Sequence, residues 1–198
     1  MIEHYASRLG AAISGIEATL HDRRISAEGA LDRTIRLFRS AMDAKGKLIF
    51  IGNGGSAALA SHAAADYGTN GQLRVIAPLD AASLTCISND LGYECVFETQ
   101  IARLCEGDDV LVAISSSGES ANVLRGADAA HRIGMRVVTL TGFNSANRLR
   151  GSGEISFWVP SDDYGIVESA HLALLHVVLD AWRTLTGRED RTVRRDMY

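Results

Sequence analysis

The sequence is poor in proline and has no excess of positive charge. Only 2 prolines occur in 198 residues, which argues against long disordered linkers. The formal net charge of −4 gives no electrostatic reason to expect nucleic acid or an anionic membrane as a partner. No apolar run approaches the ~18 residues of a membrane span. The opening MIEHYASRLG lacks the basic and apolar regions of a signal peptide, so we expect neither membrane insertion nor export.

Cysteine is scarce as well, and its three residues form no pattern. Cys86, Cys95 and Cys105 are odd in number and show none of the paired spacings of a metal site. Unpaired thiols are typical of the reducing cytoplasm, where disulfides are rare. We therefore expect a cytoplasmic protein whose reduced cysteines serve as small apolar side chains in the core.

What the sequence does contain is one stretch that predicts a strand, a glycine-rich turn and a helix in succession. Lys47–Asp66 begins with the apolar run Leu48–Ile51, turns through Gly52–Ser56 and continues as an alanine-rich segment. This order directs backbone N–H groups and a helix N-terminus toward an anion. The segment Gly52–Ser56, which we call the glycine turn, lacks the GxGxxG spacing of a dinucleotide-binding turn.

Strand-like and helix-like segments alternate along the rest of the chain. Apolar runs predict strands at 48–51, 73–77, 109–114, 136–140 and 155–159. Helical spacing predicts helices at 81–90, 94–105, 121–133 and 165–185. This alternation predicts an α/β fold with a doubly wound, flavodoxin-like parallel sheet of about five strands flanked by helices. Ligands of such sheets bind beyond the carboxyl ends of the strands.

Two extra N-terminal helices are expected ahead of the first strand. Residues 3–22 carry apolar side chains at spacings of three and four, and Ser26 is placed to cap a second helix. Helices that precede the first strand belong to no β-α-β crossover, so they either cover the sheet or pair with another subunit. We expect one domain, with a helical pair at 1–45, an α/β core at 46–186 and a charged tail at 187–198.

A serine-rich segment follows the strand expected at 109–114, and we call Ser115–Ser120 the serine turn. Its four hydroxyls belong to Ser115, Ser116, Ser117 and Ser120. Hydroxyls and free N–H groups at a helix N-terminus suit a phosphate, although one N-cap serine without a ligand explains part of the pattern. The absence of GxxxxGK[ST] excludes an NTP-binding P-loop. Because both turns follow strands, we expect them to converge, with Ser56 as the N-cap of its helix.

Two helices carry side chains that suit a metal or a proton transfer. His62 and Asp66 are four residues apart and share a helical face. Glu168 and His176 are eight apart and also lie on one side, whereas His171 is about 140° away from His176 around the axis. His62, Asp66, Glu168 and His176 suit Zn²⁺, metal-free acid–base chemistry, or a polar seam between packed helices.

Five short segments stand in one unbroken order between about Ile35 and Trp182. They are GNGGS with His62 six residues later, SNDLG at 88–92, GDDVLVAISSSGESANV at 107–123, VVTLTG at 137–142 and ExxHxxxxH at 168–176. Together they resemble the sugar isomerase (SIS) domain family. Within it, the series is most similar to the phosphoheptose isomerases, which convert sedoheptulose 7-phosphate to a heptose 7-phosphate.

The resemblance implies a single SIS domain that assembles as a homotetramer and binds a small sugar phosphate and one Zn²⁺ per site. The implied activity is aldose–ketose isomerisation by proton transfer through an enediol(ate), giving D-glycero-D-manno-heptose 7-phosphate. Two alternatives stay open at this point. One is an isomerase of another sugar phosphate, and the other is a non-catalytic phosphosugar-binding or scaffold protein of the type that binds the bacterial replication initiator.

Carried over position by position, the resemblance also assigns site residues. The residues implied to contact the sugar phosphate are Asn53, Gly54, Gly55, Ser56, Asp90, Ser115, Ser116, Ser117, Ser120 and Glu168. The implied zinc positions are His62, Asp66, Glu168 and His176. Asp66 and His176 are the implied acid/base pair, contributed to one site by neighbouring subunits.

This chain departs from the family pattern at two of these places. Asp66 stands where the family usually has the longer Glu, and Gly165–Glu168 (GIVE) stands where it usually has Asp-Arg-Ile-Gln. Glu168 adds a negative charge near the expected metal, while the missing Asp-Arg pair removes groups that suit substrate contact. The scaffold-type relative tends to read GNGTS in the first turn and lacks the second His of the last helix. GNGGS and His176 in this chain therefore favour the enzyme.

Overall fold

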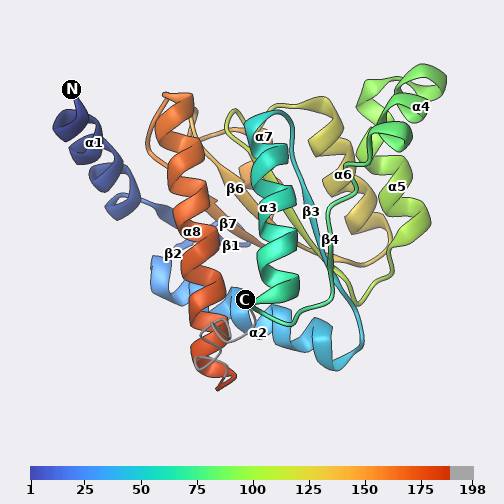
Figure 1. The fold of residues 1–198 in the computed structure, drawn as a ribbon, viewed down its shortest axis with the longest axis horizontal. Coiled ribbons are helices and arrows are strands. Elements are labelled where there is room, and N and C mark those ends of the chain that lie inside the picture. Colours follow the sequence, from blue (N-terminus) through green and yellow to red (C-terminus); the bar gives the residue numbers. More distant parts are fainter. Residues whose placement is uncertain (188–198) are drawn as a thin grey trace, which may run out of the picture.

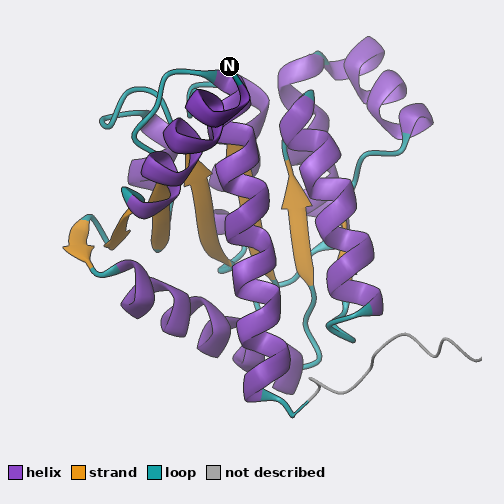
Figure 2. Ribbon diagram, turned by 60° about the vertical axis from the view of Figure 1, so that its left-hand side comes forward, coloured by secondary structure: helices purple, strands orange, loops and turns teal. Residues whose placement is uncertain are grey.

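A mixed sheet with helices on both faces forms the protein (Figures 1 and 2). The structure, a computed structural model, describes residues 1–187, so 188–198, and with them nearly all of the predicted charged tail, lie outside the described residues. The described strands are β1 (Glu17–Leu20), β2 (Arg23–Ile25), β3 (Leu48–Ile51), β4 (Val75–Ile76), β5 (Val110–Ser115), β6 (Arg136–Thr141) and β7 (Ile155–Trp158). The described helices are α1 (Ile2–Ser14), α2 (Ala27–Asp43), α3 (Gly55–Thr69), α4 (Ala81–Leu91), α5 (Val96–Leu104), α6 (Ala121–Arg132), α7 (Arg148–Ser152) and α8 (Tyr164–Leu185), with a 3₁₀ turn η1 (Tyr93–Cys95).

The strand order is β2-β1-β7-β6-β5-β3-β4, and the five strands from β7 to β4 run parallel. These five are the strands that the apolar runs predict, so the parallel α/β core is confirmed. The expected total of five is wrong, because β1 and β2 add two antiparallel strands at the β7 edge. Parallel strands buried on both faces carry apolar side chains throughout, as β3 and β5 do.

Side chains alternate between the two faces of the sheet and create two separate cores. Leu48 and Phe50 of β3 pack with α2, α3 and α8, whereas Ile49 and Ile51 pack with α5 and α6 on the opposite face. Figure 1 shows α3 and α8 side by side in front of the sheet, both descending from the carboxyl ends of strands. α4 projects at the upper right, and its only buried residue is Ile87.

The N-terminal segment differs from the expected pair of helices. The helix expected over 3–22 ends at Ser14, and the chain then forms the β1–β2 hairpin through His21 and Asp22, which both have positive φ. Ile16 and Leu20 fit a helical spacing, but pairing of β1 with β7 buries Ala18 within the sheet. The second helix is confirmed as α2, with the Ser26 hydroxyl accepting a hydrogen bond from Gly29 N at 3.1 Å.

Two composition-based expectations also need correction. Cys86 is exposed, so only Cys95 and Cys105, which are partly buried against a core, serve as apolar packing side chains. α8 is long and apolar enough to cross a membrane by length and composition alone, contrary to the expectation that no segment qualifies. In this fold α8 packs through Leu174, Leu175 and Val178 against the sheet, as the core helix of an α/β protein does.

Candidate functional site

The glycine turn lies where β3 ends and α3 begins. Gly54 is the N-cap of α3, has a φ of 53° and makes no side-chain cap hydrogen bond. The expectation that Ser56 caps the helix is therefore wrong: Ser56 is already inside the first turn and is buried. The first turn of a helix holds N–H groups without intrahelical partners, and no side chain caps them here.

The serine turn joins β5 to α6 and is held in place by hydrogen bonds from its backbone N–H groups to its own serine hydroxyls. Ser115 Oγ accepts a hydrogen bond from Gly118 N at 3.1 Å, and Ser117 Oγ accepts one from Glu119 N at 3.3 Å. Gly118 has a φ of 68°, and a Cβ there would clash with Asn147, so the turn requires glycine. Ser116 Oγ is buried without a hydrogen-bond partner among the described residues, and the N-cap Ser120 makes no side-chain cap bond.

The glycine turn is joined to the first turn of α6, directly after the serine turn, by a pair of amide side chains. Asn53 Nδ2 donates to Asn122 Oδ1, and Asn122 Nδ2 donates back to Asn53 Oδ1, both at 2.8 Å. The Tyr93 hydroxyl, from η1, donates to the same Asn53 Oδ1 at 2.8 Å. The predicted convergence of the glycine and serine turns at the carboxyl edge of the sheet is therefore confirmed, and Asn122 and Tyr93 are site residues that sequence reasoning missed.

Asp90 lies in the last turn of α4, before Gly92 ends the helix with a φ of 95°. Its carboxylate accepts a hydrogen bond from Asn89 Nδ2 at 2.8 Å and contacts Cys86 Sγ at 3.6 Å. Tyr93 connects this segment to the glycine turn. The proposed contact of Asp90 with sugar hydroxyls stays a prediction, and an exposed carboxylate three residues before Tyr93 suits it.

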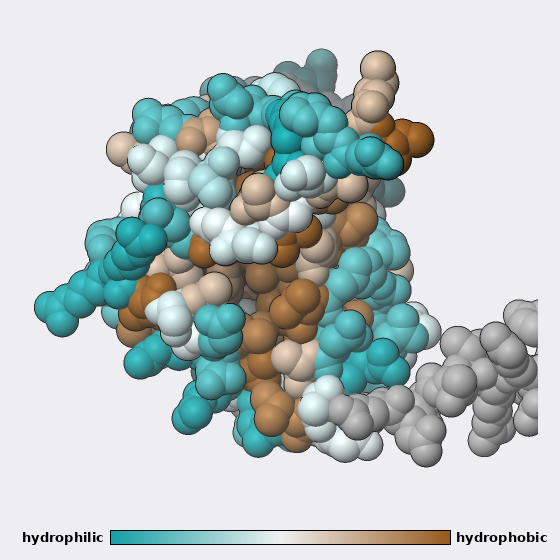
Figure 3. Space-filling view, turned by 90° about the vertical axis from the view of Figure 1, so that its left-hand side faces the viewer, coloured by the Kyte–Doolittle hydropathy of each residue, from teal (hydrophilic) through white to brown (hydrophobic). Residues whose placement is uncertain are grey.

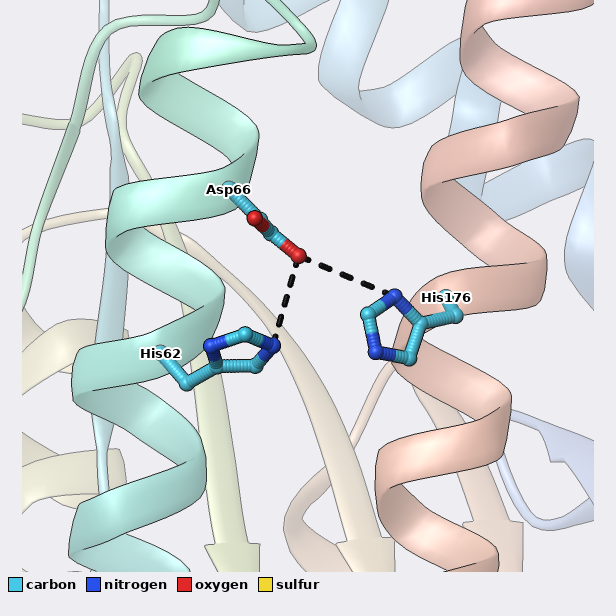
Figure 4. A group of neighbouring side chains, drawn as sticks. All are labelled: His62, Asp66 and His176. Carbon is cyan, nitrogen blue, oxygen red and sulfur yellow. Dashed lines mark ion pairs between the residues drawn. The ribbon is translucent and has the colours of Figure 1, made fainter.

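Three of the predicted ligands come together between α3 and α8 (Figure 4). His62 Nε2 lies 3.3 Å from Asp66 Oδ2, and His176 Nδ1 lies 3.7 Å from the same oxygen. Figure 4 shows the carboxylate between the two imidazoles, with all three side chains directed toward the space between the helices. We call these residues the His–Asp–His cluster. Both imidazoles are about half exposed, at 50% and 48%, so the cluster is open to solvent.

A buried tyrosine fixes the spacing of the two helices next to the cluster. The hydroxyl of Tyr67, which follows Asp66, donates to the carbonyl oxygen of Leu175, which precedes His176, at 2.8 Å. Burial raises the pKa of Tyr67 far above its ordinary value, so the hydroxyl keeps its proton and remains a donor. Asp66 and His176 of the same chain therefore come together, at 3.7 Å, while the predicted sharing of the site between neighbouring subunits stays a prediction.

Glu168, the fourth predicted ligand, is not part of this group. It is one turn into α8, eight residues or about 12 Å along the axis from His176. Its carboxylate lies against Gly55, where a Cβ would clash with it. Glu168 therefore faces the first turn of α3, on the side of the phosphate-type turns, and the four-ligand zinc set stays a prediction with three members assembled.

His171 has a different environment from the other two histidines of the site. It is fully buried, and its Nε2 donates to the Thr141 carbonyl oxygen at 3.1 Å. Because a carbonyl oxygen only accepts, Nε2 carries the proton, and Nδ1 is an acceptor without a partner among the described residues. Burial lowers the pKa of His171 to about 4, against a smaller opposing effect of this hydrogen bond. The imidazole is thus a neutral anchor between α8 and the end of β6.

The donor set of the His–Asp–His cluster fits zinc. Two imidazole nitrogens and one carboxylate oxygen lie within 4.8 Å of one another. Catalytic zinc sites typically use three such protein ligands and leave a fourth position for water or substrate. Asp66, one methylene shorter than the family's Glu, still reaches both imidazoles. The two departures of this chain therefore leave a set of metal-type ligands in place.

A sheet with five parallel strands, whose edge turns carry hydroxyls and uncapped helix N-termini, is an arrangement that α/β proteins use to bind a phosphate ester. A pair of histidines and a carboxylate on the two helices beside those turns adds acid–base chemistry to it. The family model for the SIS domain matches residues 13–142. The chain belongs to the SIS domain family and, within it, to the phosphoheptose isomerase branch.

Individual relatives support this membership. The chain is 33% identical to the phosphoheptose isomerase of Helicobacter pylori (strain P12) over 161 residues, which are 78% of this chain and 83% of that protein. The structure of a phosphoheptose isomerase from Neisseria gonorrhoeae superposes with a TM-score of 0.77 at 30% identity, over 91% of this chain and 94% of that one. A phosphoheptose isomerase from Francisella tularensis gives a TM-score of 0.79 at 26% identity, over 92% and 94% of the two chains.

Proposed function

We propose that this protein isomerises sedoheptulose 7-phosphate to D-glycero-D-manno-heptose 7-phosphate. The observation that carries the proposal is the His–Asp–His cluster on α3 and α8, the helices that follow β3 and β7 and begin at the edge of the sheet where the glycine and serine turns converge. The similarity to phosphoheptose isomerases over most of both chains supports the heptose substrate over a pentose or hexose phosphate. It likewise disfavours a scaffold without chemistry, for which an acid–base arrangement such as the His–Asp–His cluster has no use.

The reaction requires one proton to move from C1 to C2 and one to move from O1 to O2. A base removes the C1 proton of the ketose, an enediol(ate) forms, and an acid returns a proton to C2. Asp66 and His176 supply two groups of suitable type with their atoms 3.7 Å apart. The serine turn holds the phosphate at the far end of the sugar, so that remote binding energy orients the reacting carbons.

Zn²⁺ is the proposed cofactor, held by His62, Asp66 and His176, with Glu168 as a further candidate ligand. When bound, the ion would supply Lewis-acid stabilisation of the negative charge that develops on the sugar oxygens. Glu168 also remains a candidate sugar contact, because its carboxylate lies beside Gly55 of the glycine turn. We place the enzyme in the cytoplasm, since neither the charge nor the thiols suggest export.

We also propose a homo-oligomer, most simply a tetramer. α1 leaves the body of the molecule at the upper left of Figure 1 and exposes Ile2, Tyr5 and Ile13. Figure 3 views the molecule from the side of α1 and α8 and shows a continuous band of apolar side chains between polar margins, and Val177 of α8 is exposed. A second subunit would bury such a face. Sedimentation of a monomer at micromolar concentration would contradict this proposal.

The function is tested by a direct assay and two variants. Purified protein is incubated with sedoheptulose 7-phosphate, with and without added zinc, and the products are separated by chromatography. An aldoheptose phosphate of unchanged mass is expected, and a panel of pentose and hexose phosphates is expected to react more slowly. His62→Ala should lower both the zinc content and the turnover, and Asp66→Glu should retain activity because it restores the family's usual residue. The absence of product with both wild type and Asp66→Glu would refute an isomerase.

A further inference from the structure

Tyr93 is an exposed side chain whose hydroxyl makes a hydrogen bond to the glycine turn. It is 56% exposed and lies on the short turn η1, yet its hydroxyl reaches Asn53 Oδ1 of the glycine turn at 2.8 Å. It therefore joins two segments that are 40 residues apart in sequence. Tyr93 belongs neither to the His–Asp–His cluster nor to the serine turn, so the proposed function gives this hydrogen bond no role.

The orientation of the whole amide network follows from one backbone donor. Val123 N–H can only donate, and it points to Asn122 Oδ1 at 3.0 Å, which fixes which end of the Asn122 amide is oxygen. Asn122 Nδ2 must then donate to Asn53 Oδ1, and Asn53 Nδ2 to Asn122 Oδ1. The Oδ1 of Asn53 accepts from both Asn122 and Tyr93, and within residues 1–187 its second Nδ2 hydrogen has no partner and is left for a ligand.

The segment before Tyr93 has few buried contacts of its own that hold it against the rest of the protein. Of the residues of α4 only Ile87 is buried, and α4 lies at the rim of the molecule in Figure 1, away from the sheet. Asp90, the predicted sugar contact, is exposed in the last turn of this weakly packed helix. Few buried contacts allow a segment to open locally, so the bond from Tyr93 limits where Asp90 can lie relative to the glycine turn.

We propose that Tyr93 is a positioning residue for the sugar part of the substrate. Its hydroxyl ties the segment that carries Asp90 to the glycine turn and holds the Asn53 amide with its free N–H available to the sugar phosphate. The inference rests on the proposed function for its substrate, while the tether itself is independent of any ligand. Asn122, which is 2% exposed, provides the fixed side of the same network.

The test compares Tyr93→Phe with Tyr164→Phe as a matched control. Tyr164 is 62% exposed, packs its ring against Phe143 and makes no hydroxyl hydrogen bond within residues 1–187. Tyr93→Phe should raise KM for sedoheptulose 7-phosphate ~10-fold with kcat changed less than about 2-fold, because the lost interaction is of the uniform-binding type. Its Kd for inorganic phosphate should stay within about 2-fold of wild type, since the serine turn is intact. Amide exchange over 86–95 should become faster.

The other possible results of this comparison also decide whether the proposal holds. Tyr93→Phe that matches Tyr164→Phe in KM and in amide exchange would overturn it. Equal weakening of inorganic phosphate and sugar phosphate, together with a lower Tm, would indicate a general structural role and would also overturn it. If the wild type neither binds nor converts sedoheptulose 7-phosphate, the proposed function fails. The tether is then decided by amide exchange alone: faster exchange over 86–95 supports it, and unchanged exchange refutes it.

Discussion

The serine turn and the His–Asp–His cluster are built in opposite ways. The serine turn is largely buried, and backbone N–H groups and a positive-φ glycine determine its shape. The cluster consists of three side chains between α3 and α8, with both imidazoles half exposed. A turn fixed by backbone is organised before the ligand arrives, whereas exposed side chains depend on a metal, a substrate or a second subunit to fix them. Binding and chemistry should therefore respond separately to mutation.

The largest difference between an effect on turnover and an effect on phosphate binding is expected for a variant of His176. His176→Ala removes one member of the acid/base pair and should lower kcat by about 10³-fold, within the range for loss of a general acid or base. The Kd for inorganic phosphate should hardly change, because the serine turn joins β5 to α6, whereas His176 belongs to α8. Steady-state kinetics and calorimetry measure the two quantities. His4→Ala, an exposed histidine on α1, is the control, and unchanged turnover in His176→Ala would remove this residue from the mechanism.

A second contrast sets buried His171 against the exposed histidines of the cluster. The folded protein keeps His171 neutral down to its pKa of about 4, whereas the unfolded chain protonates it below the ordinary histidine pKa of 6.5. Because the unfolded state binds more protons in this window, the stabilising contribution is present above pH 6.5 and is lost as pH falls toward 4. The loss should be about 3 kcal/mol.

Urea unfolding at a series of pH values measures this effect. His171→Gln keeps an N–H donor for the Thr141 carbonyl oxygen but does not titrate, so its stability should depend less steeply on pH between 4 and 6.5 than that of wild type. The difference between the two slopes isolates His171 from the carboxylates, which titrate in both proteins. Parallel slopes would show that the imidazole is not held neutral.

Much of the core was predictable from sequence, and the differences have physical causes. β5 is a run of buried side chains with no helical period, and such runs identify parallel strands by composition alone. β1 was missed because Ile16 and Leu20 satisfy a helical spacing, and only pairing with β7, over 130 residues away, selects the strand. α7 is short and polar, with Leu149 as its only buried residue, so it leaves no periodic pattern.

In the candidate site, too, some features follow from sequence spacing and others depend on how distant segments pack. His62 and Asp66 could be paired from sequence because one helix fixes their spacing, and the same holds for the side of α8 that carries His176. Which residue of α8 meets Asp66 depends on how α3 and α8 pack, and the Tyr67–Leu175 hydrogen bond determines that here. The Asn53–Asn122–Tyr93 network joins three segments without any common period, and sequence patterns contain no signal for it.

The prediction with the smallest expected effect concerns the serine turn and compares two N-cap serines, Ser26 and Ser120. Ser26 Oγ accepts the capping hydrogen bond from Gly29 N at 3.1 Å, whereas Ser120, also an N-cap, makes no side-chain cap bond. Ser26→Ala should therefore cost about 1 kcal/mol of stability and leave phosphate affinity unchanged. Ser120→Ala should cost less than about 0.5 kcal/mol of stability but weaken the Kd for inorganic phosphate ~10-fold, since its hydroxyl is left for a ligand. Calorimetric titration and urea unfolding of both variants measure the two effects, and a Ser120→Ala protein that loses stability without losing phosphate affinity would show that the hydroxyl is a structural cap after all.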